Sequence, residues 1–279
     1  MSNTVAHALQ QPLARALDRL DAQLLLLHAL GRAGTERSWL LAHDADALSP
    51  AQEAAYLALC ARRAAGEPVA YLVGEKEFFG LMLHVDRRVL VPRPDTETLV
   101  EWALEVMAGR AQPAVIDLGT GSGAIALALQ HSRPDARIEA VDASADALAV
   151  ASANARRLAL SVVFRQAFWL EGAVQRYDLI VSNPPYVASG DAHLAALAHE
   201  PLQALAAGPD GLADLRAIVA QAPACLAPGG WLLLEHGWDQ AGAVRALLQG
   251  AGFTGVASRR DLAGTERCSG GTWRQQDAA

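Results

Sequence analysis

The chain has 279 residues, of which 52% are hydrophobic and 19% charged, so it can bury one large core and a second, smaller one. Its formal net charge of -7 excludes a protein that holds nucleic acid mainly by neutralising phosphates, because that mode needs a surplus of basic residues. Cys60, Cys225 and Cys268 have no zinc or disulfide spacing, which excludes a disulfide scaffold and predicts no metal site. The apolar run at residues 24–27 is too short to cross a bilayer, and we expect an unprocessed protein of the cytoplasm.

The N-terminal part has a helical pattern over residues 12–65. One helix is predicted to carry leucines at three- and four-residue spacing on one face: Leu13, Leu17, Leu20, Leu24 and Leu27. Another should begin at Ser49, whose hydroxyl can cap the first turn with Gln52 completing a capping box, and should end near Gly66. Residues 1–75 contain no catalytic cluster, so we predict a small helical bundle that positions a partner.

A strand-like pattern follows in residues 78–91, with Asp86-Arg87-Arg88 as the predicted polar turn. This pattern predicts a β-hairpin linker over residues 76–93. After the linker, Asp95 is predicted to cap a helix with an apolar side made of Leu99, Val100, Trp102, Ala103 and Val106. The second domain is then expected to occupy residues 94–279.

Strands and helices alternate through the second domain. Strands are predicted at residues 115–118, 137–141, 162–165, 179–182, 231–235 and 253–258. Helices are predicted after Ser122, over 145–158, from about 211 and over 241–248. Such alternation indicates an α/β fold with a mostly parallel sheet of six or seven strands, covered by helices on both faces.

A glycine-rich loop, Gly119-Thr120-Gly121-Ser122-Gly123, follows the first of these strands and opens a helix. Its backbone can turn tightly and approach a ligand closely, which predicts a nucleotide-like ligand at the carboxyl edge of the sheet. Asp142, at the end of the next strand, can accept hydrogen bonds from both ribose hydroxyls or can cap the helix that follows. The same pattern satisfies a dinucleotide fingerprint, so an NAD dehydrogenase stays an alternative, as does a glycine turn that only joins strand to helix.

The loop Asn183-Pro184-Pro185-Tyr186 follows the strand at 179–182 and is the most specific feature of the chain. Two prolines fix the backbone and remove two N–H donors, so the loop should present hydrogen-bond acceptors. The side-chain oxygen of Asn183 and the carbonyl of Pro184 can accept both hydrogens of a planar NH2 group, against which Tyr186 can pack. Because an amide nitrogen is a poor nucleophile, holding both of its N–H groups and aligning it with a methyl donor favours methyl transfer.

Several motifs together resemble a known family. Asp117 to Gly123, Val141-Asp142 and Val181 to Tyr186 are similar to the class I S-adenosylmethionine-dependent methyltransferases that modify planar nitrogens, including DNA adenine methyltransferases. The upstream Val91-Pro92-Arg93-Pro94-Asp95-Thr96-Glu97, together with the hairpin and the helical domain, resembles the release factor glutamine methyltransferases, the HemK or PrmC family. The segments 233–237 and 260–264 are similar to that family too, so the resemblance covers nearly the whole chain.

The resemblance implies a Rossmann-like, mostly parallel seven-stranded sheet with a small N-terminal helical domain. It implies N5 methylation of the glutamine in the Gly-Gly-Gln motif of bacterial class 1 release factors, which the helical domain would bind. S-adenosylmethionine would be held by Gly119, Thr120, Gly121, Ser122, Gly123, Asp142, Phe168 and Asn183. Asn183, Pro184, Pro185 and Tyr186 would bind the glutamine, with Asn183, Pro184 and Tyr186 in catalytic roles. No direct contact with nucleic acid or membrane is expected, and a monomer is expected.

Two segments depart from the family pattern. Ala167 stands where the family has an aspartate near the adenine amine, so cofactor affinity is expected to be reduced. Either Phe168 occupies the place of the family tryptophan, or Trp169 does so through a local register shift. The stretch from Asp191 to Pro201 is short against the family pattern, although it keeps Glu200 before Pro201.

Other functions remain open at this stage. A sister group methylates a glutamine of a ribosomal protein with the same loop, but residues 93–97 are more similar to the release factor branch. A DNA adenine-N6 methyltransferase is disfavoured by the acidic balance and by the lack of a basic target-recognition segment. An NAD dehydrogenase leaves residues 183–186 unexplained, and Ala167 motivates a catalytically dead binding module as a further alternative.

Overall fold

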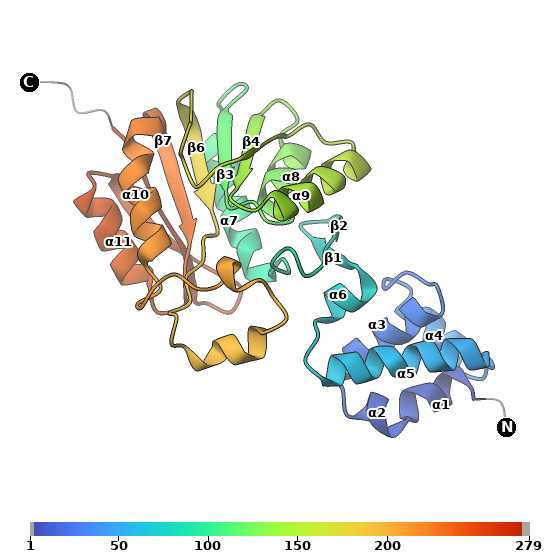
Figure 1. Cartoon of the computed structure of the whole chain (residues 1–279). Helices are drawn as coiled ribbons and strands as arrows, with labels where there is room; N and C mark the ends of the chain where they lie inside the picture. Colours follow the sequence, from blue (N-terminus) through green and yellow to red (C-terminus); the bar gives the residue numbers. More distant parts are fainter. Residues whose placement is uncertain (1–2, 275–279) are drawn as a thin grey trace, which may run out of the picture. The chain divides into compact units, whose positions relative to one another are not determined.

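The computed structural model describes residues 3–274, and the chain divides into two compact units, Met1–Glu75 and Lys76–Ala279 (Figure 1). The first unit contains the helices α1 (Val5–Gln10), α2 (Pro12–Arg15), α3 (Arg19–Ala29), α4 (Arg37–Ala42), α5 (Pro50–Ala64) and α6 (Val69–Val73). Its core is closed by fully buried side chains of α3 and α5, among them Leu25, Leu26, Leu27 and Tyr56.

The single helix predicted through the leucines at 13 to 27 is wrong. Asp18 accepts a hydrogen bond from the backbone N–H of Leu20 and caps a new helix, α3. Leu17 and Leu20 therefore do not lie on one face of a continuous helix. Leu20 is consequently 43% exposed, and the buried run is shifted to residues 25–27. The capping box at Ser49 is confirmed, since Ser49 and Gln52 bond to each other's backbone N–H groups at the start of α5.

The hairpin is present, but its predicted turn is wrong. Strand β1 (Glu75–Phe78) pairs with β2 (Leu81–His84), and the turn lies at Phe79-Gly80, where both residues have positive φ angles of 49° and 77°. The residues expected in the turn, 86–88, lie beyond the hairpin, where Asp86 binds the side chain of Arg88. Since the glycine at the turn lies between Phe79 and Leu81, both apolar, the polar stretch was the stronger local signal.

The cap predicted at Asp95 is also wrong. Pro94–Thr96 form a short 3-10 helix, η1, and α7 (Glu97–Met107) follows it without a side-chain cap. Asp95 instead lies 3.2 Å from the guanidinium of Arg267. The buried side of α7 ends with Met107, whereas Val106 is only partly buried.

The second unit is built on a seven-stranded sheet in the order β5-β4-β3-β6-β7-β9-β8. Its strands are β3 (Ala114–Leu118), β4 (Arg137–Asp142), β5 (Val163–Gln166), β6 (Tyr177–Ser182), β7 (Leu226–Glu235), β8 (Thr254–Arg260) and β9 (Glu266–Thr272). The first five strands in this order pair in parallel, and β9 runs antiparallel to both neighbours. The predicted fold class is confirmed.

Strand β9 was not placed from the sequence because its Ser269-Gly270-Gly271 segment has no strand pattern. The tertiary structure requires glycine there, since a Cβ on Gly270 would come within 2.4 Å of Leu233 and 3.2 Å of Trp102. The close approach of β9 to β7 therefore depends on a residue that weakens the local strand signal.

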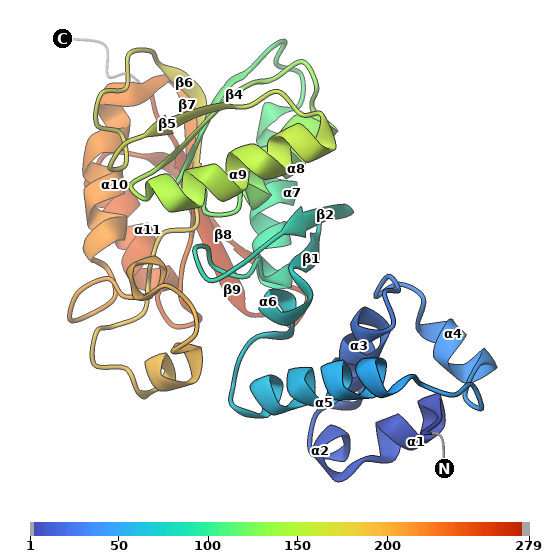
Figure 2. The ribbon, with the colours of Figure 1, turned by 45° about the vertical axis from the view of Figure 1, so that its right-hand side comes forward.

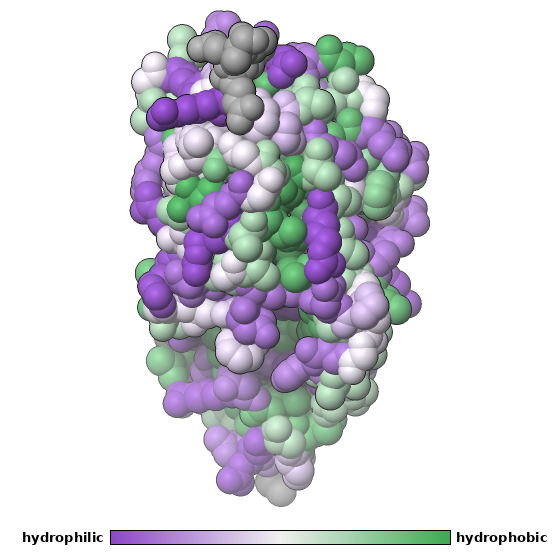
Figure 3. Space-filling view, turned by 90° about the vertical axis from the view of Figure 1, so that its left-hand side faces the viewer, coloured by the Kyte–Doolittle hydropathy of each residue, from purple (hydrophilic) through white to green (hydrophobic). Residues whose placement is uncertain are grey.

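Helices cover both faces of the sheet (Figures 1 and 2). On one face lie α7, α8 (Ala124–Ser132) and α9 (Ala145–Leu158), and on the other lie α10 (Ala213–Cys225) and α11 (Ala241–Gly250). The buried side chains of α10 and α11 belong to one core cluster with side chains of β3, β6 and β7, and α11 packs on β8 and β9. Figure 3 shows polar side chains surrounding smaller apolar areas on the outer surface. No helix among residues 3–274 is long and apolar enough to span a bilayer.

The order of the strands determines where a ligand can bind. From β3 the chain proceeds to β4 and β5 on one side and then returns to β6 on the other. Loops that leave β3 and β6 therefore diverge at their carboxyl ends and leave a crevice between them. Both motifs singled out in the sequence, 119–123 and 183–186, lie at this edge.

Candidate functional site

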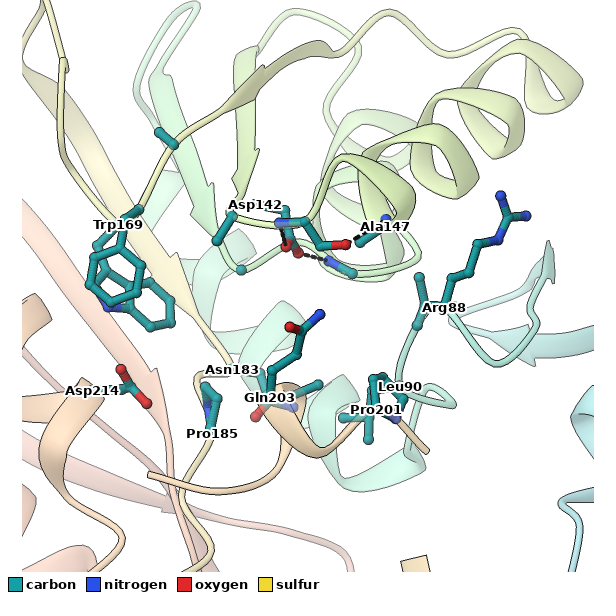
Figure 4. A pocket seen from close by; sticks show the side chains of 18 residues that line it. Arg88, Leu90, Asp142, Ala147, Trp169, Asn183, Pro185, Pro201, Gln203 and Asp214 are labelled. Carbon is teal, nitrogen blue, oxygen red and sulfur yellow. Dashed lines mark hydrogen bonds between the residues drawn. The ribbon is translucent and has the colours of Figure 1, made fainter. Parts of the chain in front are cut away.

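A cavity opens at the carboxyl ends of β3, β4, β5 and β6 (Figure 4). Predicted site residues that line it are Gly119, Gly121, Asp142, Phe168, Asn183 and Pro185. Residues that had not been predicted also line it, among them Arg88, Gln203 and Asp214. The remaining predicted residues, Thr120, Ser122, Gly123, Pro184 and Tyr186, belong to the same loops but are not among the lining residues.

The glycine loop is folded back onto the neighbouring strand. The N–H groups of Gly119 and Thr120 both donate to the carbonyl of Val141 at 2.9 Å. Gly119 and Gly121 have φ angles of 70° and 54°, and a Cβ built on Gly121 would meet nothing within 4 Å. The loop therefore presents backbone to open cavity space, as a cradle for a close-fitting ligand requires.

Asp117 lies behind this loop and is fully buried. Its Oδ2 accepts hydrogen bonds from Thr120 Oγ1 at 2.7 Å and from the N–H of Ala126 at 3.2 Å, whereas Oδ1 has no partner among the described residues. Burial raises the pKa of Asp117 to about 7 against these two hydrogen bonds. The carboxyl group thus braces the loop and is partly protonated near pH 7, a role that sequence reasoning missed.

Asp142 connects the end of β4 to the glycine loop. Its Oδ2 accepts from the N–H of Gly121 at 2.9 Å, and its Oδ1 accepts from the N–H of Ser144 at 2.8 Å. The alternative role as helix cap belongs to Ser144, whose side chain accepts from Ala147 at the start of α9. Burial raises the pKa of Asp142, yet each oxygen keeps a lone pair that can face the cavity.

Two aromatic residues follow β5 in different environments. Phe168 is 47% exposed and lines the cavity, whereas Trp169 is 7% exposed and belongs to the core behind it. The Trp169 ring lies close enough to Gly119 that a Cβ on the glycine would come within 3.2 Å of it. Both rings therefore border the cavity, and Phe168 is the more exposed of the two.

Ala167 supplies no carboxylate at this end of the cavity. Ala167 lines the cavity and its N–H donates to the carbonyl of Asp142 at 3.1 Å. Asp214, from the start of α10, lies at the same end as Trp169 (Figure 4). Burial raises the pKa of Asp214, and nothing in the local sequence around it signalled a site.

Tertiary contacts hold the Asn183 to Tyr186 loop from several directions. The Ser182 hydroxyl donates to the carbonyl of Leu118 at 2.7 Å, which ties the ends of β6 and β3 together. Gln240 donates from Nε2 to the carbonyl of Tyr186 at 3.0 Å. A Cβ on Gly211 would come within 2.3 Å of the same carbonyl, so only glycine permits this approach.

Two hydrogen-bond acceptors of the loop have no partner among the described residues. The amide nitrogen of Asn183 donates to Thr96 Oγ1 at 3.2 Å, so Nδ2 has a partner and Oδ1 is left for another donor. Among residues 3–274, no hydrogen bond uses Asn183 Oδ1 or the Pro184 carbonyl. Burial raises the pKa of Tyr186, which keeps its hydroxyl protonated and unsuited to act as a base.

The opposite wall is tied to the segment that precedes α7. Glu200, whose side chain is 3% exposed, accepts from the N–H of Val91 at 3.0 Å and pairs with Arg93. The adjacent Pro201 and Gln203 line the cavity. A buried charge that is paired and hydrogen-bonded in this way holds two distant segments together.

Comparisons with known proteins match both units of the chain. A model described as the PrmC N-terminal domain matches residues 5–74, and one described as the methyltransferase small domain matches residues 96–208. The chain is 56% identical over 259 residues to the release factor glutamine methyltransferase of Bordetella pertussis, covering 91% of this chain and 95% of that one. It is 52% identical to the protein of the same name from Burkholderia pseudomallei, covering 92% and 93%.

The sheet and its helices are also similar to solved methyltransferases. The structure of a 16S rRNA N2 methyltransferase (RsmC) from T. thermophilus, in complex with AdoMet and guanosine, aligns with a TM-score of 0.55 at 22% identity. The alignment covers 72% of this chain and 50% of that one. At this identity the likeness establishes the fold alone.

Proposed function

The chain belongs to the family of release factor glutamine methyltransferases, and we propose that it transfers a methyl group from S-adenosylmethionine to the N5 side-chain nitrogen of the glutamine in the Gly-Gly-Gln motif of class 1 release factors. The observation that carries this proposal is the pair of unused acceptors, Asn183 Oδ1 and the Pro184 carbonyl, beside a glycine loop that can hold a nucleoside.

We assign the cofactor to the cavity lined by Gly119, Gly121, Asp142, Phe168 and Asn183, with Thr120, Ser122 and Gly123 completing the glycine loop. The open space above Gly121 fits the close approach of a ligand to the backbone, and the half-exposed Phe168 ring offers a flat apolar surface to an adenine. Asp142 can accept from ribose hydroxyls with the lone pairs that Gly121 and Ser144 leave free. When bound, S-adenosylmethionine supplies an electrophilic methyl group on a sulfonium.

The chain's own residues make the amide nitrogen reactive by holding it. Asn183 Oδ1 and the Pro184 carbonyl accept its two N–H groups, which orients the nitrogen and increases the electron density on it. The Tyr186 ring packs beside the planar group, and its protonated hydroxyl does not compete as a base. The product's extra proton passes to water. Orientation and hydrogen bonding, rather than a strong base, therefore promote the reaction.

The same reasoning assigns the rest of the chain. We propose that residues 1–75 bind the release factor, that residues 76–93 act as a hairpin linker, and that residues 94–279 perform the transfer. The acidic balance favours a protein substrate over direct nucleic-acid binding. We further propose a monomer that acts in the cytoplasm, where release factors meet the ribosome.

The test is mass spectrometry of a purified class 1 release factor after incubation with this protein and S-adenosylmethionine. One added methyl group on the Gly-Gly-Gln peptide is expected, and the Asn183→Ala variant serves as the control for enzyme-dependent transfer. Cofactor binding by calorimetry without methylation would reject the release factor as substrate. In that case the same assay on ribosomal proteins and on adenine-containing DNA decides between the two alternative acceptors.

A further inference from the structure

A buried carboxyl group lies next to the amide-binding loop. Glu235 ends β7, and because Ser182 pairs with Leu234 in the parallel β6–β7 ladder, Glu235 occupies the strand position beside Asn183. Glu235 is 1% exposed. No ion pair among residues 3–274 involves it, and its Oε2 has no hydrogen-bond partner there. A charged side chain so placed is costly, and its presence needs a reason.

The neighbours of Glu235 are the residues that hold the loop. Burial raises its pKa to about 7, while hydrogen bonding by Thr96, the positive charge of Arg267 and hydrogen bonding by Asn183 oppose the rise. The negative charge of Asp95 adds to it. Arg267 itself pairs with Asp95 and Asp261 at 3.2 Å, so its charge is already compensated.

The chemistry of these groups gives the hydrogen bonds a direction. Thr96 Oγ1 accepts from Asn183 Nδ2 at 3.2 Å and has a single proton of its own to donate. The Glu235 carboxyl group keeps an acceptor oxygen whether or not it is protonated, so it can accept a hydrogen bond from the Thr96 hydroxyl. The order of donation is therefore from Asn183 Nδ2 to Thr96 and from Thr96 to Glu235, and Asn183 Nδ2 also donates toward the same carboxyl group.

This direction determines which end of the Asn183 amide faces the substrate. With Nδ2 held by Thr96, Oδ1 is the atom left for the cavity. Without the acceptor at 235, the Thr96 hydroxyl could donate to Asn183 Oδ1, and the side-chain amide could rotate so that its oxygen and nitrogen exchange places. The cavity would then meet the NH2 end of Asn183, which repels another NH2 group instead of binding it.

We propose that Glu235, acting through Thr96, is a positioning residue that keeps the Asn183 amide oxygen turned toward the substrate nitrogen. The inference deepens the proposed function and rests on it for its catalytic consequence. Its structural content, the orientation of one side-chain amide, can be measured without any methyl transfer.

The experiment compares two matched pairs of variants in the full chain. Thr96→Val keeps the shape of threonine but removes its hydroxyl, and Thr96→Ser restores the hydroxyl. Glu235→Met removes the acceptor with little change of length, and Glu235→Gln restores one acceptor oxygen. Thermal melting checks that each variant is folded, and replacement of a buried carboxyl group by methionine is expected to preserve the melting temperature.

The kinetic result expected is a fall in kcat by roughly 10- to 100-fold in Thr96→Val and Glu235→Met, with a much smaller change in KM for S-adenosylmethionine. Thr96→Ser and Glu235→Gln are expected to recover most of that loss. A kcat within about twofold of the wild type in both Thr96→Val and Glu235→Met overturns the proposal.

The second measurement is the side-chain NH2 signal of Asn183 by nitrogen-15 NMR, assigned by its disappearance in Asn183→Ala. The signal is expected to move in Thr96→Val and in Glu235→Met, and to stay near its wild-type position in the two restored variants. A signal unmoved in Glu235→Met overturns the proposal even if kcat falls. Absence of methylation by the wild type would refute the proposed function, whereas the NMR result would still decide the orientation of Asn183.

Discussion

The side-chain nitrogen of Asn183 lies 3.2 Å from Thr96 Oγ1, although the two residues are 87 positions apart in the chain. One follows β6 in the loop that offers acceptors to an amide, and the other ends the short 3-10 helix before α7. This contact leaves Asn183 Oδ1 as the free end of the amide. The Asn183 to Tyr186 loop therefore depends on a segment that the local sequence does not connect with it.

Asn183→Ala should lower kcat by roughly 100-fold, because one of the two acceptors for the substrate amide is removed. The fold should persist, since Asn183 lies in a partly exposed loop. Steady-state methylation of a release factor measures the effect. Ser189→Ala, an exposed change further along the same chain segment, is the matched control. Near-normal turnover in Asn183→Ala would refute the amide clamp.

Asp142→Ala should weaken S-adenosylmethionine binding by roughly 10- to 100-fold, because hydrogen bonds to a charged group typically contribute about 1.5–3 kcal/mol. Turnover at saturating cofactor should change less. Calorimetry gives the dissociation constant, and Asp146→Ala, on the exposed side of the next helix, is the control of like charge. An unchanged dissociation constant would contradict the assignment of Asp142 to the ribose.

Phe168→Ala should weaken cofactor binding by about 5- to 150-fold, since stacking of a base on an aromatic ring contributes about 1–3 kcal/mol. Phe168→Trp keeps an aromatic face and should bind nearly as the wild type does. Both dissociation constants come from the same calorimetric titration. Equal affinities for the alanine and tryptophan variants would show that Trp169, and not Phe168, meets the adenine.

The stability of the protein should fall between about pH 4 and pH 7 because of Asp117. In the unfolded chain this carboxyl group loses its proton near its ordinary pKa of 3.8, but in the folded protein it keeps the proton until about pH 7. The folded state therefore binds more protons across this range, and its free energy of unfolding decreases as pH rises. The decrease is absent below the range and complete above it, with a size on the order of 4 kcal/mol.

Asp117→Asn isolates this contribution. Asparagine stays neutral, and its side-chain oxygen can still accept hydrogen bonds from the Thr120 hydroxyl and from the N–H of Ala126. Urea unfolding of both proteins at pH 5 and pH 8 gives the difference, in which the contributions of other titrating groups cancel. The wild type should lose more stability than the variant on going to pH 8. An equal loss would mean that Asp117 is already ionised at pH 5.

Local sequence was sufficient for much of the fold and for the position of the site. Alternating strands and helices predicted the α/β class, and the capping box at Ser49 was visible in four consecutive residues. The glycine loop and the loop at 183–186 were placed at the carboxyl edge of the sheet because each directly follows an apolar strand. These signals are short in range, so neighbouring residues carry them completely.

Errors occurred where several local signals competed. The leucine spacing continued through Asp18, but the cap formed there starts a new helix. The polar residues 86–88 were a stronger turn signal than Phe79-Gly80. Asp95 has the sequence pattern of a helix cap, but its side chain pairs with Arg267 instead. In each case the outcome depended on packing with residues distant in the chain.

The sequence by itself determined the family, the class of reaction and the positions of the glycine loop and of the loop at 183–186. Only the tertiary structure decided that Asn183 is held by Thr96, that Glu235 is buried beside them, and that burial raises the pKa of Asp117 behind the glycine loop. The physical reason is that hydrogen-bond direction and desolvation depend on which groups surround an atom in space. Those surroundings come from strands and loops that are far apart in sequence.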